Sequence, residues 1–212
     1  MGAEVKKSAL GGRGLFATQP FAPGDSVLAL DRPLITALDK ERVLDTCSWC
    51  FAWTELPVLS GAGVNAATKV HWCGCKQVKF CSKTCQTRAW KAWHKQECKL
   101  LATQEEIVPN TVVAVMRMMQ GVKNGQDSHK AILDMQTHRD DFEKAGGKKW
   151  EAMQLMAHTA LKLLGEKQNT ASLDPTVLAM CMVMCNSIRV ITATFDVSIS
   201  RIRNVLSGRT MT

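Results

Sequence analysis

The chain has 212 residues, of which 46% are hydrophobic and 22% charged, a composition that is typical of a globular protein with one or two domains and excludes a disordered chain. The formal net charge of +8 tolerates acidic partners but does not by itself indicate nucleic-acid binding. There is no apolar stretch of about 18 residues, and residues 1–14 are polar and glycine-rich. We therefore expect neither a membrane span nor a secretory signal peptide.

Short strands are expected within residues 13–36. Gly11, Gly12 and Gly14 give the backbone freedom around Arg13. The candidate strands are Leu15–Phe16, Val27–Leu30 and Leu34–Ile35, and Phe21–Asp25 contains the proline and glycine of a turn. Strands this short must pair into a larger sheet.

Four close pairs of possible metal ligands lie between residues 47 and 98. They are Cys47 with Cys50, Cys73 with Cys75, Cys81 with Cys85, and His94 with Cys98. Zinc prefers four sulfur or nitrogen donors in a tetrahedron, and each pair supplies two donors from one short stretch of backbone. Four pairs therefore predict two closed zinc sites. The alternative, a disulfide framework, is typical of small secreted proteins and is not favoured here.

A helical pattern is expected from Ser82 onward. Cys81 and Cys85 are four residues apart, as are His94 and Cys98, so that each pair would lie on one face of a helical turn. Residues 107–188 are also expected to be helical.

Two helices in this region have clear patterns. The apolar stripe of the Lys148–Leu164 helix consists of Trp150, Met153, Ala157, Leu161 and Leu164, and Gly165 stands where the helix would end. Asp174-Pro175 predicts the start of the next helix. The segment Val177–Cys185 is apolar on every side, which predicts burial.

The remaining residues of the C-terminal part have simpler interpretations. Met180, Met182 and Met184 are expected to fill the core, and Cys181 and Cys185 to be buried thiols, although their spacing would also suit a metal. The segment Ile188–Ser198 is expected to form a strand or two, and Arg201–Thr212 to fray.

The run Phe80–Cys98 resembles the second half of a MYND finger. That family uses a cross-braced arrangement, which implies one zinc ion on Cys47, Cys50, Cys81 and Cys85 and a second on Cys73, Cys75, His94 and Cys98. The family spaces its second pair as Cys-x2-Cys, which would place a ligand at Trp72, so either Cys73 or His71 could complete the second site. Two Zn²⁺ ions add four positive charges and seven thiolates remove seven, which lowers the formal net charge to about +5.

Tryptophan is concentrated in the same segment, which holds Trp49, Trp53, Trp72, Trp90 and Trp93. The simple interpretation is that they pack around the metals. The resemblance also implies a groove for proline-containing peptides, lined by Gln86 and Trp90. The basic residues in the second half of the finger are Lys76, Lys79, Lys83, Arg88, Lys91, Lys95 and Lys99. They could contact phosphates, but we favour a solvated face that offsets the thiolate charge.

Three N-terminal segments, Gly12–Thr18, Phe21–Asp25 and Leu30–Leu34, resemble the opening of a SET domain. Together with the finger, they are similar to the SET-and-MYND family of protein lysine methyltransferases, whose Cys-Asn-Ser-Phe element resembles Cys185–Ile188. The resemblance implies that Arg13, Gly14 and Asn186 contact S-adenosylmethionine, because glycine permits close approach of the backbone to a ligand.

This resemblance implies an α+β fold with partial SET strands, a cross-braced two-zinc finger and a helical insert. The expected parts are residues 10–46 for the N-terminal part of the SET domain, 47–98 for the finger, 99–186 for the insert, 187–200 for the start of the C-terminal half and 201–212 for a divergent tail.

The family's catalytic residues have no counterpart here. The chain contains no tyrosine, and none of its five histidines follows an asparagine, so the family's Asn-His-Ser-Cys segment is missing. We therefore assign no catalytic residue and expect a truncated or alternatively spliced product. Its expected function is that of a zinc-binding protein-interaction module on an incomplete SET scaffold.

Two alternatives stay open. One is an active lysine methyltransferase that is completed by a partner chain or a longer isoform, acting on a histone or another lysine-bearing protein. The other is a nucleic-acid-binding zinc protein, which the sequence does not favour. The family resemblance implies a location in the nucleus and cytoplasm, and we do not expect secretion.

Overall fold

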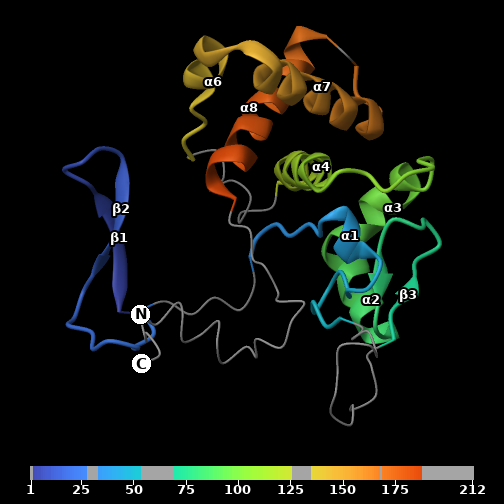
Figure 1. Ribbon diagram of the computed structural model, residues 1–212, viewed down its shortest axis with the longest axis horizontal. Helices are drawn as coiled ribbons and strands as arrows, with labels where there is room; N and C mark the ends of the chain where they lie inside the picture. The colour runs from blue at the N-terminus through green and yellow to red at the C-terminus, as the bar shows by residue number, and fades with distance from the viewer. Residues whose placement is uncertain (1, 28–32, 54–68, 126–134, 168, 188–212) are drawn as a thin grey trace. The chain divides into compact units, whose positions relative to one another are not determined.

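The computed structural model describes residues 2–27, 33–53, 69–125, 135–167 and 169–187 (Figure 1). The chain divides into two compact units, Met1–Pro33 with Arg189–Thr212, and Leu34–Ile188. The first unit contains a β-hairpin, and the second contains the cysteine-rich segment and a group of helices. The protein therefore has the predicted α+β class, while the predicted domain boundaries stay a prediction. Most of Val27–Leu30 and all of Ile188–Ser198 and Arg201–Thr212 lie outside the described residues.

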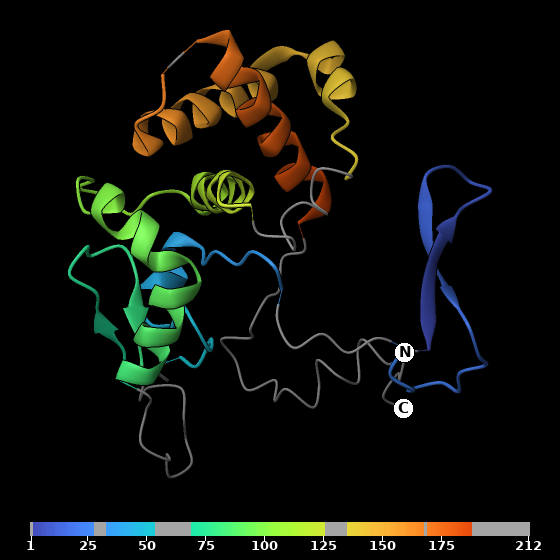
Figure 2. The ribbon, with the colours of Figure 1, turned by 180° about the vertical axis from the view of Figure 1, so that it is seen from behind.

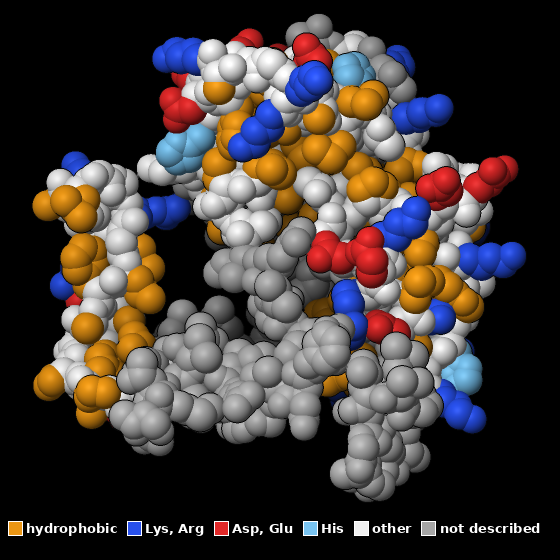
Figure 3. All heavy atoms as spheres, viewed as in Figure 1, with side chains coloured by type: hydrophobic (Ala, Val, Ile, Leu, Met, Phe, Trp, Pro, Cys, Tyr) orange, Lys and Arg blue, Asp and Glu red, His pale blue; other side chains and the backbone are white. Residues whose placement is uncertain are grey.

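The hairpin consists of β1 (Ala3–Lys7) and β2 (Arg13–Ala17), which pair antiparallel with Lys7 opposite Arg13. Gly11 and Gly12 make the turn with φ angles of 114° and 61°, which residues with a side chain rarely adopt. The large apolar residues Val5, Leu15 and Phe16 are exposed, and Figure 3 shows hydrophobic side chains along the hairpin. Because a lone two-stranded hairpin is only marginally stable, this element needs further pairing or packing.

The sequence predictions for the strands are correct only in part. The expected strand at Leu15 and Phe16 is present in β2, but β1 was not predicted, because Val5 is its only large apolar residue. The expected strand at Leu34–Ile35 is wrong, since this segment forms a bend. Ile35 instead packs against the hydrophobic core of the helices, so that side-chain packing determines its conformation.

The cysteine-rich segment contains a small hairpin followed by one long helical run. Strands β3 (His71–Trp72) and β4 (Lys79–Phe80) pair antiparallel, and α1 (Lys40–Val43) precedes them in the chain. The helical run consists of α2 (Lys83–Ala89), the π-helix η1 (Trp90–His94) and α3 (Lys95–Leu101). The run begins where the sequence predicts, since the Ser82 hydroxyl accepts a hydrogen bond from the backbone N–H of Cys85 at 3.2 Å.

In the part of the second unit that the structure describes, the cysteine-rich segment is followed by the helices α4 (Asn110–Lys123), α6 (Arg139–Ala145), α7 (Gly147–Leu164) and α8 (Thr170–Asn186). Helix α4 packs against α7 and α8 on one side and against α3 on the other, and both views of the ribbon show this layering (Figures 1 and 2). The shared core includes Leu101, Val112, Val115, Met116, Met153, Ala157 and Met180. Helix α4 thus connects the cysteine-rich segment to the helical core.

Helix α7 confirms its prediction from sequence. Met153, Ala157 and Leu161 are buried, and Trp150 and Leu164 pack partly against the same core. Gly165 ends the helix with a φ of 68°, in the left-handed conformation expected of a terminal glycine.

Helix α8 begins earlier than predicted. The expected start at Asp174-Pro175 is wrong, because the helix begins at Thr170 and includes Pro175. Asn169 is the capping residue, and its side-chain oxygen accepts a hydrogen bond from the Ser172 N–H at 3.0 Å. Pro175 lies beyond the first turn of the helix, where it cannot donate a hydrogen bond to the Ala171 carbonyl and its ring crowds that carbonyl, and the asparagine cap offsets part of this cost.

We expect Asn169→Ala to lower the free energy of unfolding by about 1 kcal/mol, because the Ser172 N–H would lose its capping acceptor. Urea denaturation followed by far-UV circular dichroism measures this change. Asn169→Asp restores an acceptor at the same place and should retain most of the stability. Equal stability of the alanine variant and the parent would contradict the assignment of this cap.

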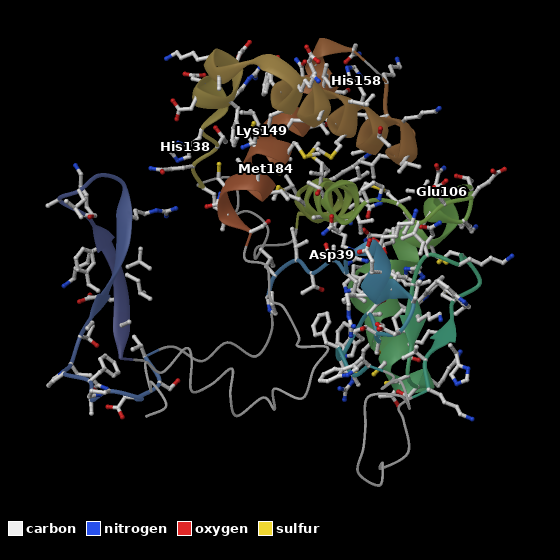
Figure 4. All side chains as sticks on the ribbon, in the orientation of Figure 1. Asp39, Glu106, His138, Lys149, His158 and Met184 are labelled. Atoms are coloured by element: carbon white, nitrogen blue, oxygen red, sulfur yellow. The ribbon has the colours of Figure 1, made fainter. Side chains whose placement is uncertain are left out.

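The end of α8 also differs from expectation. Met180, Met182 and Cys181 are buried as predicted, but Met184 is 41% exposed and Cys185 is exposed. Figure 4 shows Met184 on the lower part of α8. The buried part of the helix ends at Val183, and no core cluster of the described residues extends to the last turn. Although α8 is strongly apolar, none of the described helices combines the length and the hydropathy needed to cross a membrane.

Candidate metal centre

The first cluster consists of Cys47, Cys50, Cys81 and Cys85, whose sulfur atoms all lie within 4.8 Å of one another. Cys50 Sγ lies 3.5 Å from Cys81 Sγ, which lies 3.6 Å from Cys85 Sγ. Phe51 follows the first pair with a φ of 63°, and its N–H donates to the Cys47 carbonyl at 3.0 Å. This tight turn brings Cys47 and Cys50 close to Cys85 at the start of α2.

The second cluster consists of Cys73, Cys75, His94 and Cys98, with all ligand atoms again within 4.8 Å. Nε2 of His94 lies 3.1 Å from Cys73 Sγ and 3.6 Å from Cys75 Sγ, and Cys73 Sγ lies 3.9 Å from Cys98 Sγ. The short Cys73-Gly74-Cys75 spacing is accommodated by a turn, in which Lys76 has a φ of 55° and its N–H donates to the Cys73 carbonyl at 2.9 Å.

The alternative ligand His71 does not join the second cluster. His71 lies on the exposed strand β3, and Trp72, which occupies the family's usual ligand position, is 43% exposed. Cys73 is buried beside His94 instead. Within the described residues, the geometry therefore favours Cys73 over His71.

Burial and neighbouring groups shift the thiol pKa values in both clusters. Burial alone would raise the pKa of Cys73, but the backbone N–H of Cys75 and the neighbouring His94 lower it to about 7. Burial together with the charges of Cys73 and Cys98 raises the pKa of Cys75 to about 12. In the first cluster, burial and the adjacent thiols of Cys81 and Cys47 raise the pKa of Cys50 to about 12. Neighbouring thiolates oppose one another's ionisation, and a divalent cation removes this opposition.

Both clusters fit zinc. A tetrahedral site with Zn–S bonds of about 2.3 Å and Zn–N bonds of about 2.0 Å separates two sulfurs by roughly 3.8 Å and a sulfur from a nitrogen by roughly 3.6 Å. The observed separations of 3.5–3.9 Å between sulfurs agree, as does the 3.6 Å between Cys75 Sγ and His94 Nε2, whereas the 3.1 Å between Cys73 Sγ and His94 Nε2 is shorter than such a site requires. The donors are the thiolates and imidazole that structural zinc prefers, and the residues present fit two closed Zn²⁺ sites.

Aromatic rings surround the second cluster. The His94 ring meets Phe80, Trp90 and Trp93 edge to face, with centroid separations of 5.6–5.9 Å. Of the five tryptophans in the cysteine-rich segment, Trp49 and Trp93 are half-buried and pack against its buried core.

Two residues that sequence reasoning missed complete the surroundings of His94. Glu97 is fully buried, and its Oε1 lies 3.2 Å from Nδ1 of His94. Arg117 of α4 forms an ion pair with Glu97. Burial alone would raise the pKa of Glu97, but the charge and hydrogen bonds of Arg117 lower it. The available signal was that Glu97 is the single acidic residue among the basic residues of the segment 80–99.

The two residues expected to bind peptide lie one helical turn apart. Gln86 is half-buried on α2, with its Oε1 accepting a hydrogen bond from Lys83 Nζ at 3.1 Å, and Trp90 is 41% exposed. Residues separated by four positions share a helix face, so both side chains are available to the same ligand.

The residues expected to contact S-adenosylmethionine lie in different units. Arg13 and Gly14 are on β2 in the first unit, whereas Asn186 ends α8 in the second. The Asn186 amide donates to the backbone carbonyls of Gln136 at 3.1 Å and Met182 at 2.9 Å. These bonds give Asn186 a structural role at the end of α8, and the cofactor contacts stay a prediction.

Residues 47–98 match the MYND finger family. The chain is 26% identical over 192 residues to histone-lysine N-methyltransferase SMYD3 of Homo sapiens, covering 86% of this chain and 41% of that protein. It is 29% identical over 188 residues to SET domain and MYND-type zinc finger protein 6 of Schizosaccharomyces pombe, covering 87% and 34%. It is 28% identical over 137 residues to histone-lysine N-methyltransferase SMYD1 of Homo sapiens, covering 62% and 25%.

These matches identify a MYND-type zinc finger in a chain that is similar to SET-and-MYND methyltransferases. The two zinc clusters coincide with the matched segment. The chain spans less than half the length of each of these relatives.

Proposed function

We propose that this chain is a zinc-stabilised protein-interaction module, and that it binds proline-containing peptides through Gln86 and Trp90. The observation that carries the proposal is the exposure of Trp90, which is 41% accessible on a helical run that bears ligands of both zinc clusters. A large aromatic side chain held rigidly at a surface loses little conformational entropy on binding. Extended proline-rich segments suit such a surface because they are already ordered when free.

A peptide array on the zinc-loaded full chain tests the proposal. The probes are proline-containing peptides and matched copies with each proline replaced by alanine. For the peptides that bind, we expect Trp90→Ala to weaken the affinity by about 30-fold, equivalent to roughly 2 kcal/mol for an aromatic residue at the centre of an interface.

Trp72→Ala is the matched control, because Trp72 is exposed to a similar extent on another part of the finger. It should leave the affinity unchanged. Equal binding of the proline and alanine peptides, or equal losses in the two tryptophan variants, would exclude the proposed surface.

A second candidate function is lysine methyl transfer, which the similarity to histone-lysine N-methyltransferases supports. The chain has no tyrosine and no Asn-His-Ser-Cys segment, so we propose that it does not catalyse this reaction alone. An assay with labelled S-adenosylmethionine and histones separates the two functions. Turnover above background that is lost in Arg13→Ala would favour the enzyme. We also propose that the protein is located in the nucleus and cytoplasm.

A further inference from the structure

A buried ion pair connects the second zinc cluster to helix α4. Glu97 lies on α3, one residue before the ligand Cys98, and both its oxygens are bonded to Arg117 on α4. Arg117 Nε donates to Oε2 at 2.8 Å and Nη2 donates to Oε1 at 2.7 Å. Two parallel bonds between a guanidinium and a carboxylate fix both the distance and the orientation of the two groups.

The same carboxylate also contacts a zinc ligand. Oε1 of Glu97 lies 3.2 Å from Nδ1 of His94, whose Nε2 faces Cys73 and Cys75. When Nε2 binds a metal, Nδ1 carries the proton and donates it to an acceptor. A carboxylate in this place fixes the tautomer and orientation of the ring.

Arg117 also contacts Trp93 of the finger and Thr36, which lies in the segment before the finger. Its guanidinium carbon lies 3.6 Å from the centroid of the Trp93 ring, and Nη1 donates to the backbone carbonyl of Thr36. Through Arg117, the position of α4 therefore depends on contacts with Thr36, with Trp93 and with Glu97.

A second buried attachment joins the cluster to the chain segment that leads into α4. Gln77, two residues after the ligand Cys75, donates from Nε2 to the carbonyls of Gln104 at 3.3 Å and Glu106 at 2.8 Å. Its Oε1 accepts a hydrogen bond from the Val108 N–H at 2.9 Å. Both halves of the second cluster are thus bonded to the beginning of the helical region.

We propose that Glu97 and Arg117 couple occupancy of the second zinc site to the stability of the helices α4, α7 and α8. Glu97 is a positioning residue that holds His94 for the metal, and Arg117 transmits the order of that site to α4. This coupling goes beyond the proposed function, because it does not depend on which partner the finger binds.

The alternative is an ion pair that only supports the fold. Zinc removal would then expose α4 through the lost packing of α3 alone, and the size of this effect would be the same when either partner of the pair is replaced. A coupling pair makes the protection of α4 depend on zinc, and this dependence should weaken when either partner is replaced.

Hydrogen exchange measured by mass spectrometry on the full chain distinguishes these cases. In the parent protein, zinc removal should reduce amide protection in α4 and α7 by about tenfold, within the usual range of coupling between two sites. In Arg117→Met the zinc-dependent change should fall to about twofold, because the Gln77 attachment remains. Arg139→Met is the matched control, since it removes a half-exposed ion pair with Asp174 and should retain the tenfold change.

Zinc release to a chromophoric chelator provides the second measurement. Glu97→Gln keeps the shape of the side chain but removes its charge, and we expect one of the two zinc ions to leave about 10–100-fold faster. Unchanged release from Glu97→Gln, or a full zinc dependence of α4 in Arg117→Met, would overturn the proposal. If Arg117→Met does not fold even with zinc, hydrogen exchange is measured on Glu97→Gln instead. A zinc-dependent change in α4 that stays near tenfold in Glu97→Gln would then overturn the proposal.

Discussion

Removal of zinc by a strong chelator is expected to unfold residues 47–98. The buried core of this segment consists of Cys47, Cys73, Cys75, Val78, Phe80, Cys85 and Ala89, so more than half of its members are zinc ligands. Structural zinc contributes an apparent binding free energy of about 10–16 kcal/mol in small fingers. This is comparable to the whole stability of a typical domain, roughly 5–15 kcal/mol, and the few remaining apolar contacts cannot replace it.

Tryptophan fluorescence reports this unfolding selectively, because five of the six tryptophans lie between Trp49 and Trp93. We expect the emission to shift to longer wavelength on chelation and to return when Zn²⁺ is added, whereas Mg²⁺, which prefers oxygen ligands, should not restore it. Limited proteolysis should show new cleavage at the lysines of the finger. Unchanged fluorescence and cleavage in strong chelator would show that the clusters are not structural zinc sites.

The composition of the second site can be tested with a matched pair of variants. Cys73→Ser removes a residue whose sulfur lies 3.1 Å from His94 Nε2, whereas His71→Ala removes an exposed residue two positions away. Native mass spectrometry should find two zinc ions in the parent and in His71→Ala, and one tightly bound ion in Cys73→Ser. The reverse result would assign the ligand role to His71.

The parts of the site that sequence predicted well are those that depend on local spacing. His94 and Cys98 are neighbours on one helical turn, whereas Cys81 directly precedes Ser82, the cap of the helix that carries Cys85, and in both pairs the four-residue spacing brings the ligands together. The division into two sets of four came from the resemblance to a cross-braced finger, and the structure places the ligand atoms in those same two sets. The end of α7 at Gly165 is likewise a local property, since glycine readily adopts the left-handed conformation found there.

The features that sequence missed depend on tertiary contacts. Glu97 and Arg117 are 20 residues apart and lie on different helices, so no local pattern pairs them. Gln77 resembles any surface glutamine until residues 104–108 fold over it. Asp174-Pro175 has the chemistry of a helix start, but Asn169 caps the helix earlier, and the helix continues through the proline. In each case a contact from another part of the chain, or a competing cap, determined the outcome.

Arg117→Met is expected to lower the free energy of unfolding of the Leu34–Ile188 unit by about 3–5 kcal/mol. Glu97 is fully buried, and removal of its partner leaves a carboxylate charge that water cannot reach. The loss would be a large fraction of the stability of an ordinary domain. Urea denaturation of the zinc-loaded protein, followed by far-UV circular dichroism, measures the change through the helices.

Two further variants show whether the unpaired charge is the cause. Arg139→Met removes an arginine from a half-exposed ion pair with Asp174, and its cost should not exceed about 1 kcal/mol. The double variant Glu97→Gln/Arg117→Met removes both charges of the buried pair and should be more stable than Arg117→Met alone. If the double variant is instead less stable than Arg117→Met by the full cost of Glu97→Gln, the two residues act independently. The stability of this unit would then not depend on the charge pair.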